Sequence, residues 1–323
     1  MCLSGWQWVV LVFLAAVGGV IGSFLNVVIY RLPAGRSIIW PGSCCPACGR
    51  PIRWYDNVPV LSWFLLRGRC RDCRTPISWR YPAVEAITMG LFVLLGLWEW
   101  MSGGQHLPVR PIRIDGSVLW LPWTAPQLTA LYVYHLMLGC TLLAATLIEY
   151  DHPKVSGRVW VRLFWPAFVW GFGAAFVWPA VHPVPAFGPA PEGWAGRLLG
   201  LIDSLVGLGA GTTVGLVWCL MAGLLIGPSW KNRANPGVWI SGVGSSGLVG
   251  LYLGWQAGLA VGGISGLLWC LACILVRYLR MARKTFPPTD RAFPIPLSAW
   301  LGLSSLLWIL FWKHWLDWAA RVF

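Results

Sequence analysis

The chain has 323 residues, of which 57% are hydrophobic and only 11% are charged. Ordinary globular domains carry about a quarter charged residues, so this composition excludes a typical soluble domain and indicates a protein of the lipid bilayer. The net charge of +13 at pH 7 could suit a nucleic-acid binder. However, nineteen of the 24 Lys and Arg residues fall in alternate loops between apolar runs. That pattern is a membrane topology signal, so we expect no nucleic-acid partner.

Apolar runs long enough to cross a bilayer recur along the whole chain. A helix needs about 20 residues to span a hydrocarbon core of about 30 Å. The sequence therefore predicts an all-α polytopic membrane protein of about eight transmembrane helices in contact with lipid. The expected spans are 8–30, 84–100, 127–148, 159–181, 198–227, 238–255, 258–278 and 297–312.

The distribution of basic residues also predicts the orientation of the chain. Loops rich in Lys and Arg stay in the cytoplasm, and the loop between the first two spans is the most basic one. An even number of spans then places both termini outside. The first apolar run lacks a basic segment before it and a small-residue cleavage site after it, so we interpret it as a retained span rather than a signal peptide.

The loop after the first span carries two CxxC pairs, Cys45 with Cys48 and Cys70 with Cys73. Two such pairs can present four thiolates at the corners of a tetrahedron, which is the arrangement that structural Zn²⁺ prefers. Neighbouring arginines are expected to favour the thiolate forms. The sequence thus predicts a closed, structural zinc site in a small cytoplasmic module.

Two disulfides are the alternative for these cysteines, although a cytoplasmic loop would keep them reduced. Cys44 is adjacent to Cys45 and could replace it as a ligand. A third CxxC pair, Cys270 with Cys273, lies inside an apolar run, where cysteine behaves as a small hydrophobic residue. We expect that pair to pack and not to bind metal.

The order of motifs around the cysteines is more specific than the cysteines alone. The string from the end of the first span to the start of the second resembles the prepilin leader peptidases, membrane enzymes that process type IV prepilins and type II secretion pseudopilins. The motifs are Gly22-Ser23-Phe24-Leu25-Asn26, Tyr30-Arg31-Leu32-Pro33, Asp56-Asn57-Val58-Pro59-Val60-Leu61-Ser62-Trp63 and Arg80-Tyr81-Pro82-Ala83-Val84-Glu85. Weaker matches follow at Leu253-Gly254-Trp255-Gln256 and Phe293-Pro294-Ile295-Pro296-Leu297.

The resemblance implies a fold, an activity and partners. Members of this family cut a leader peptide with two aspartates at the cytoplasmic membrane boundary, and many then methylate the new N-terminus with S-adenosylmethionine. It also implies the bacterial inner membrane and prepilin or pseudopilin N-terminal segments as partners. We expect three parts: a first transmembrane helix (1–30), a cytoplasmic zinc module (31–82) and a seven-helix peptidase-like domain (83–323).

The aspartate positions of the family are altered here. The resemblance places Glu149 at the first catalytic position, followed by Asp151, which matches a family acid that we do not take to be catalytic. The longer Glu side chain displaces the carboxylate by more than an ångström, and misplacements of that size can cost about a hundredfold in rate. Asp151 is the candidate substitute on the same helix end.

The second catalytic aspartate has no counterpart. Depending on the register, Gly242 or Ser245 occupies its position, and residues 204–289 contain no Asp or Glu. A dyad needs one ionised and one protonated acid, and serine cannot carry that charge. Asp203 is expected near the outer face, and Asp290 in a cytoplasmic loop is the remaining acid that could rescue a dyad.

Three functional hypotheses remain open. The leading one is a degenerate prepilin peptidase whose peptidase activity is lost or altered, acting as a binding protein for pilin-like helices or secretion partners. The enzymatic alternative uses a relocated acid or retains only methyl transfer. A transporter would require paired ionisable groups at mid-membrane or an internal repeat, and His135 is the main ionisable residue within a span.

Overall fold

The computed structural model describes residues 4–107, 110–114, 117–121, 123–152, 155–177, 193–226, 236–282 and 296–322. The chain divides into two compact units, Met1–Met101 and Ser102–Phe323. The first span, the cysteine loop and the second span therefore share one unit. The three-part division expected from sequence stays a prediction.

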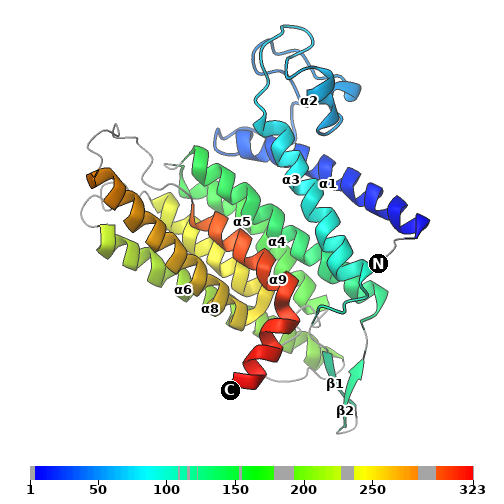
Figure 1. Ribbon diagram of the computed structural model, residues 1–323, viewed down its shortest axis with the longest axis vertical. Coiled ribbons are helices and arrows are strands. Elements are labelled where there is room, and N and C mark those ends of the chain that lie inside the picture. The colour runs from blue at the N-terminus through cyan, green and yellow to red at the C-terminus, as the bar shows by residue number, and fades with distance from the viewer. Residues whose placement is uncertain are drawn as a thin grey trace. The chain divides into compact units, whose positions relative to one another are not determined.

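The N-terminal unit is built on two long helices, α1 (Gly5–Arg31) and α3 (Arg80–Leu95). Figure 1 shows α1 crossing α3 in this unit. They approach closely because α1 carries glycine where it meets α3: a Cβ on Gly22 would lie 2.7 Å from the Cα of Glu85. After Leu95 the helix continues as a π-helical segment, Gly96–Met101. Between α1 and α3 the loop contains a 3-10 turn at Trp54–Asp56 and the short helix α2 (Leu61–Leu65).

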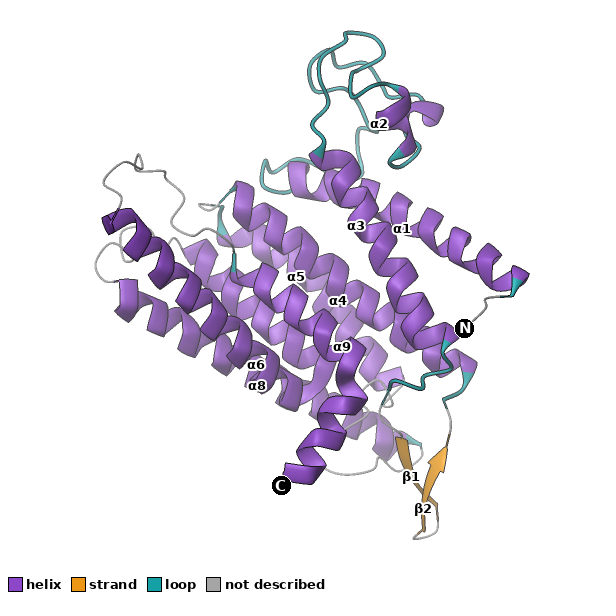
Figure 2. Cartoon of the chain, viewed as in Figure 1, coloured by secondary structure: helices purple, strands orange, loops and turns teal. Residues whose placement is uncertain are grey.

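The C-terminal unit begins with a two-stranded antiparallel hairpin that the sequence did not predict. Its strands are β1 (Arg110–Ile114) and β2 (Ser117–Leu121), with Ile112 opposite Leu119. The helices that follow are α4 (Ala125–Asp151), α5 (Gly157–Val177), α6 (Trp194–Ile226), α8 (Pro236–Ala282) and α9 (Leu297–Val322). Figure 2 shows that this unit is otherwise helical among its described residues, so the predicted fold class is confirmed.

Helix α8 is two helices joined by a break at Gly254, whose φ of 85° and ψ of 172° are not helical. The chain reverses there, and the two halves come close together: a Cβ on Gly258 would lie 3.1 Å from the Cα of Gly250. The break leaves the carbonyl of Leu251 without its usual helical donor. The hydroxyl of Tyr134 in α4 donates to that carbonyl oxygen at 3.1 Å.

The reversal in α8 lets α6 pack along both of its halves. A Cβ on Gly207 of α6 would overlap the carbonyl oxygen of Gly250 in the first half. Further along α6, a Cβ on Gly262 would reach the Val214 side chain from the second half. Backbone approach of this kind requires residues without side chains, which is why this part of the chain is so rich in glycine.

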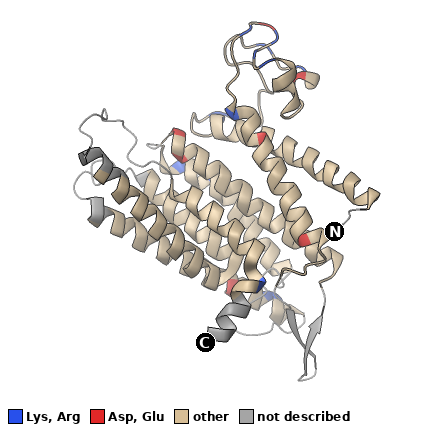
Figure 3. Cartoon of the chain, in the orientation of Figure 1, with Lys and Arg blue, Asp and Glu red and all other residues tan. Residues whose placement is uncertain are grey.

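By length and composition, six of the described helices could cross a membrane. The first five expected spans correspond to one such helix each. The sixth and seventh expected spans both lie in α8, which counts once, and the eighth falls on α9, which is not among the six. In Figure 3, the charged residues of the described segments lie in the cysteine loop and near helix ends, with long uncharged stretches of ribbon between them.

Candidate functional site

The four predicted cysteine ligands come together. The Sγ atoms of Cys45, Cys48, Cys70 and Cys73 all lie within 4.8 Å of one another, and those of Cys45 and Cys73 are 3.8 Å apart. All four are free thiols rather than disulfides. A tetrahedral ion with metal–sulfur bonds of about 2.3 Å has sulfur–sulfur edges of about 3.8 Å. The donor set and its spacing therefore fit a single metal ion.

Both halves of the cluster are built on the same backbone turn. In the first, the N–H of Cys45 donates to the carbonyl of Arg50, and the N–H of Gly49 returns to the carbonyl of Cys45. In the second, the N–H of Cys70 donates to the carbonyl of Thr75, and the N–H of Arg74 donates to the carbonyl of Cys70. Gly49 has φ of 70° and Arg74 has φ of 59° at equivalent positions. The backbone of Cys44 forms an isolated antiparallel β-bridge with Pro51, and its side chain is not part of the cluster.

Charged neighbours of the cluster are largely paired with one another. Arg71 donates to both carboxylate oxygens of Asp56, at 2.7 and 2.6 Å, and this lowers the pKa of Asp56 and raises that of Arg71. Arg50 and Arg53 approach Asp72 at 3.4 and 3.5 Å.

Thr75, more than the arginines, favours the thiolate of Cys73. Its side chain lies 3.3 Å from the Cys73 sulfur. Hydrogen bonds from the Thr75 hydroxyl and backbone lower the pKa of Cys73 to about 6. Hydrogen bonding by Thr75 is thus the leading cause of the lowered pKa of Cys73, and the effect of the arginines on the thiolates stays a prediction.

A cavity of about 860 Å³, lined by both polar and apolar side chains, adjoins this loop. It is bounded by the end of α1, both cysteine turns and the start of α3. Basic, acidic and aromatic side chains all reach it, among them Arg31, Arg36, Glu85 and Trp40. Arg31 also holds the loop, because its guanidinium donates to the carbonyls of Ser37, Pro41 and Gly42.

The second predicted site centres on Glu149, which is buried at the end of α4. Its Oε2 accepts hydrogen bonds from Ser241 Oγ at 2.8 Å and from Ser298 Oγ at 3.0 Å. Ser241 lies near the start of α8 and Ser298 near the start of α9, so three helices meet at one carboxylate. Sequence reasoning missed both serines. The only sequence feature that could have identified them is a hydroxyl residue near the start of an apolar helix. Many serines that serve only in packing have the same feature.

The other predicted positions do not supply a second acid. A Cβ on Gly242 would lie 3.2 Å from Cys219 Sγ, so this position faces α6. Ser245 is fully buried and its hydroxyl has no hydrogen-bond partner among the described residues. Asp151 ends α4 and is partly buried, while Asp290 lies outside the described residues.

Asp203 is remote from Glu149, as expected. It lies on α6 beyond Gly207, which meets α8 near Gly250. Ser241, the partner of Glu149, is nine residues before Gly250, or about 14 Å at 1.5 Å per helical residue. Asp203 therefore cannot pair with Glu149.

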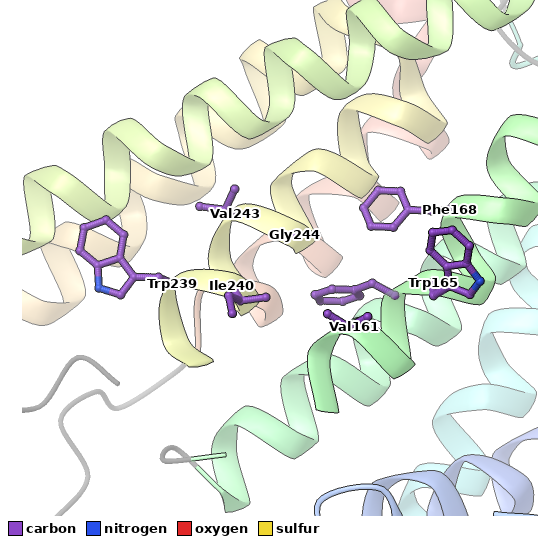
Figure 4. Close-up of a pocket in the computed structure, with 8 residues that line it drawn as sticks. Val161, Trp165, Phe168, Trp239, Ile240, Val243 and Gly244 are labelled. Atoms are coloured by element: carbon purple, nitrogen blue, oxygen red, sulfur yellow. The ribbon is translucent and has the colours of Figure 1, made fainter. Parts of the chain in front are cut away.

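An apolar groove of about 450 Å³ lies between α5 and the first half of α8 (Figure 4). The α5 side chains Val161, Phe164, Trp165 and Phe168 form one wall. The other wall is Trp239, Ile240, Val243 and Gly244. The groove thus borders the helical turn that carries Ser241, on a face without charge.

Comparison with known proteins agrees with the motifs. Residues 16–99, all of which fall within the N-terminal unit, match the Bacterial Peptidase A24 N-terminal domain. The prepilin leader peptidase/N-methyltransferase of Myxococcus xanthus is 37% identical over 166 residues, covering 49% of this chain and 50% of that protein. The protein of the same name from Klebsiella pneumoniae is 49% identical over 90 residues, which cover 26% of this chain and 40% of the relative.

A longer match extends into the C-terminal unit. The Aeromonas hydrophila prepilin leader peptidase/N-methyltransferase is 28% identical over 336 residues, covering 94% of this chain and 91% of the relative. In the first curated relatives, by contrast, the match spans about half of their length. No solved structure matches significantly. The chain is therefore similar to a prepilin leader peptidase/N-methyltransferase over most of its length, and residues 16–99 match the Bacterial Peptidase A24 N-terminal domain.

Proposed function

We propose that the chain is a multi-pass protein of the bacterial inner membrane that binds pilin-like N-terminal segments without cutting them by an aspartic dyad. The observation that carries this proposal is the environment of Glu149, whose carboxylate accepts hydrogen bonds from two serine hydroxyls and, among the described residues, from no second carboxyl group. In this proposal the chain keeps the helical scaffold and the cysteine loop of the prepilin leader peptidases, but it lacks their pair of catalytic acids.

The chemical reason is that an aspartic dyad divides two roles between two acids. One ionised carboxylate takes a proton from water, and one protonated carboxyl polarises the scissile carbonyl. Ser241 and Ser298 both donate hydrogen bonds to Oε2 of Glu149. They occupy this oxygen, but a serine hydroxyl cannot serve as the second carboxyl group of a dyad. Peptidase activity of the family type is therefore lost or altered.

Binding of a hydrophobic segment is supported by the groove between α5 and α8. Its lining is entirely apolar and it borders the Ser241 turn, so an apolar helix lying there would place its end near Glu149. Prepilin or pseudopilin N-terminal segments are the proposed occupants, since relatives are named for processing prepilins. Lipid is the other apolar component in contact with these helices.

The test is co-expression with a tagged prepilin in bacteria that lack their own peptidase. We expect the prepilin to co-purify at its full length. Leader removal by the unmutated chain that disappears in Glu149→Ala, but not in the loop-acid control Asp72→Ala, would overturn the loss of peptidase activity. Cleavage that survives both Glu149→Ala and Asp151→Ala would place the chemistry outside these acids.

We further propose that the cysteine cluster holds structural Zn²⁺ through Cys45, Cys48, Cys70 and Cys73. Four thiolates close the coordination shell, so such an ion stabilises the loop and performs no chemistry on a substrate. Metal analysis of the purified protein should find about one zinc per chain. Placement of this loop in the cytoplasm and of both termini outside follows from the basic residues and belongs to the same proposal.

Methyl transfer is a second candidate activity, supported by the cavity in the N-terminal unit. A volume of about 860 Å³ lies within the usual range of ligand sites, about 300–1,000 Å³. S-adenosylmethionine combines an aromatic base, a cationic centre and a carboxylate, and the cavity offers Trp40, Glu85 and Arg36 to such groups. Binding of the labelled methyl donor to the purified protein tests this activity separately from leader cleavage.

A further inference from the structure

The loop contains a backbone conformation that calls for an explanation. Val60 has φ of 63° and ψ of −52°, and the N–H of Leu61 donates to the carbonyl of Pro59 at 2.6 Å. These values define a γ-turn of the positive-φ kind, which is rare and strained. For a β-branched residue a positive φ is a true outlier, because the branched side chain crowds the backbone in this region. Such a conformation persists only where surrounding contacts hold it.

The contact that holds it comes from Glu85 in the second turn of α3. The N–H of Val60 donates to Glu85 Oε2 at 2.6 Å. The side chain of Ser23 in α1 is a second hydrogen-bond partner of the same carboxylate. One partly buried acid therefore connects α1, α3 and the strained turn.

Close packing leaves the turn little freedom to relax. A Cβ on Gly19 of α1 would lie 2.9 Å from the Pro59 side chain, so α1 has a glycine where the turn rests on it. A Cβ on Gly22 would lie 2.7 Å from the Cα of Glu85, and this glycine brings α3 equally near. Both glycines thus bring the acid and the turn within hydrogen-bonding distance.

Hydrogen bonds also connect the segment around the strained turn to the cysteine cluster. The N–H of Val58 donates to Ser62 Oγ at 2.8 Å, and Ser62 Oγ donates to the carbonyl of Tyr55. Asp56, next to Tyr55, holds Arg71 in the second CxxC turn. Hydrogen bonds and the short chain segments between them therefore link Glu85 to the second CxxC turn.

We propose that Glu85 is a positioning residue, which holds the Pro59–Leu61 turn in its strained form and thereby fixes the cysteine loop on α1 and α3. Glu85, Val58 and Ser62 all line the loop cavity, so this clamp also sets the shape of that cavity. The role goes beyond the proposed function, because it requires neither leader cleavage nor methyl transfer.

The test is a double-mutant cycle on the full chain in lipid nanodiscs, read by hydrogen exchange of the backbone amides of residues 57–66. Glu85→Ala removes a hydrogen bond to a charged group, and we expect exchange in this segment to accelerate about tenfold to a hundredfold. Asp72→Ala removes an acid of the same loop that pairs with Arg50 and Arg53 and not with the turn, and it should leave the exchange of residues 57–66 within about threefold of the parent.

Rescue separates positioning from a general loss of structure. Val60→Gly has little steric cost at φ of 63°, so it should leave the parent nearly unchanged and restore most of the protection lost in Glu85→Ala. Additive effects in the cycle, or unchanged exchange in Glu85→Ala, would overturn the proposal.

Glu85→Gln keeps an oxygen acceptor but removes the charge. If Glu85→Ala does not fold, hydrogen exchange of residues 57–66 is measured in this variant instead. We expect intermediate exchange for this variant, between the parent and the fully deprotected segment. Exchange of residues 57–66 equal to that of the parent would show that the charge of Glu85 does not hold the turn, and would also count against the proposal.

Discussion

The two units of this molecule differ in how completely their motifs form sites. In the N-terminal unit the motif residues find partners: four cysteines cluster, Asp56 holds Arg71, and Glu85 holds Val60. In the C-terminal unit the first acid position is buried and bonded, but serines surround it. The comparison shows that the cysteine motif brings its four side chains together, whereas the buried carboxylate of Glu149 meets two serine hydroxyls from distant helices.

The comparison is tested most strongly at the cysteine cluster. Cys45→Ser or Cys70→Ser should lower the metal content from about one ion per chain to nearly none, because metal binding and loop folding are coupled. Cys44→Ser is the matched control, since Cys44 lies outside the cluster. Metal analysis by mass spectrometry measures both. A metal content unchanged in Cys45→Ser would contradict the assigned ligand set.

The next largest effect is expected where α6 meets α8. Gly207→Ala should destabilise the protein by about 3 kcal/mol, since the new Cβ would overlap the carbonyl oxygen of Gly250. Gly209→Ala on the same helix has no neighbour within 4 Å and serves as the control. Thermal unfolding in detergent compares the two. Equal unfolding temperatures would mean that the two helices do not approach as closely as described.

The Glu149 junction should respond more moderately. Ser241→Ala and Ser298→Ala each remove one donor from a buried carboxylate, and each should destabilise the protein by about 1–3 kcal/mol. Because both serines bond to Oε2, their effects should be non-additive. Thermal unfolding of the single and double variants measures this coupling. Strict additivity would show that the two serines act independently.

The smallest effect concerns the ion pair of Asp56 with Arg71. The pKa of Asp56 is lowered in the folded protein, so its contribution is complete above its ordinary pKa near 3.8 and is lost as the pH falls below that value. Asp56→Asn should therefore increase protease cleavage of the loop at pH 7 by less than about fivefold. The difference between variant and parent should shrink as the pH falls below 3.8 and through the lowered pKa of Asp56, where an acid-active protease gives the comparison. A difference that grew at low pH would contradict this assignment.

Different parts of the fold were accessible to sequence reasoning for different reasons. Spans and clustered cysteines follow local patterns, either runs of apolar residues or fixed CxxC spacing. These patterns predicted the helices and the meeting of the four cysteines, whose role as metal ligands stays a prediction. Ser241 and Ser298 are 92 and 149 residues from Glu149 in the chain. No local pattern marks a serine as the partner of a distant acid, so the junction emerged only from helix packing.

By itself, the sequence determined that this is a helical membrane protein with a four-cysteine loop and without a second acid in residues 204–289. Composition, spacing and absence of a residue type are properties of the chain that folding cannot change. Only the tertiary structure decided that Glu149 is held by two serines, that α8 reverses at Gly254, and that Glu85 holds a strained turn at Val60. Each of these depends on which distant backbones approach one another, and that is set by packing.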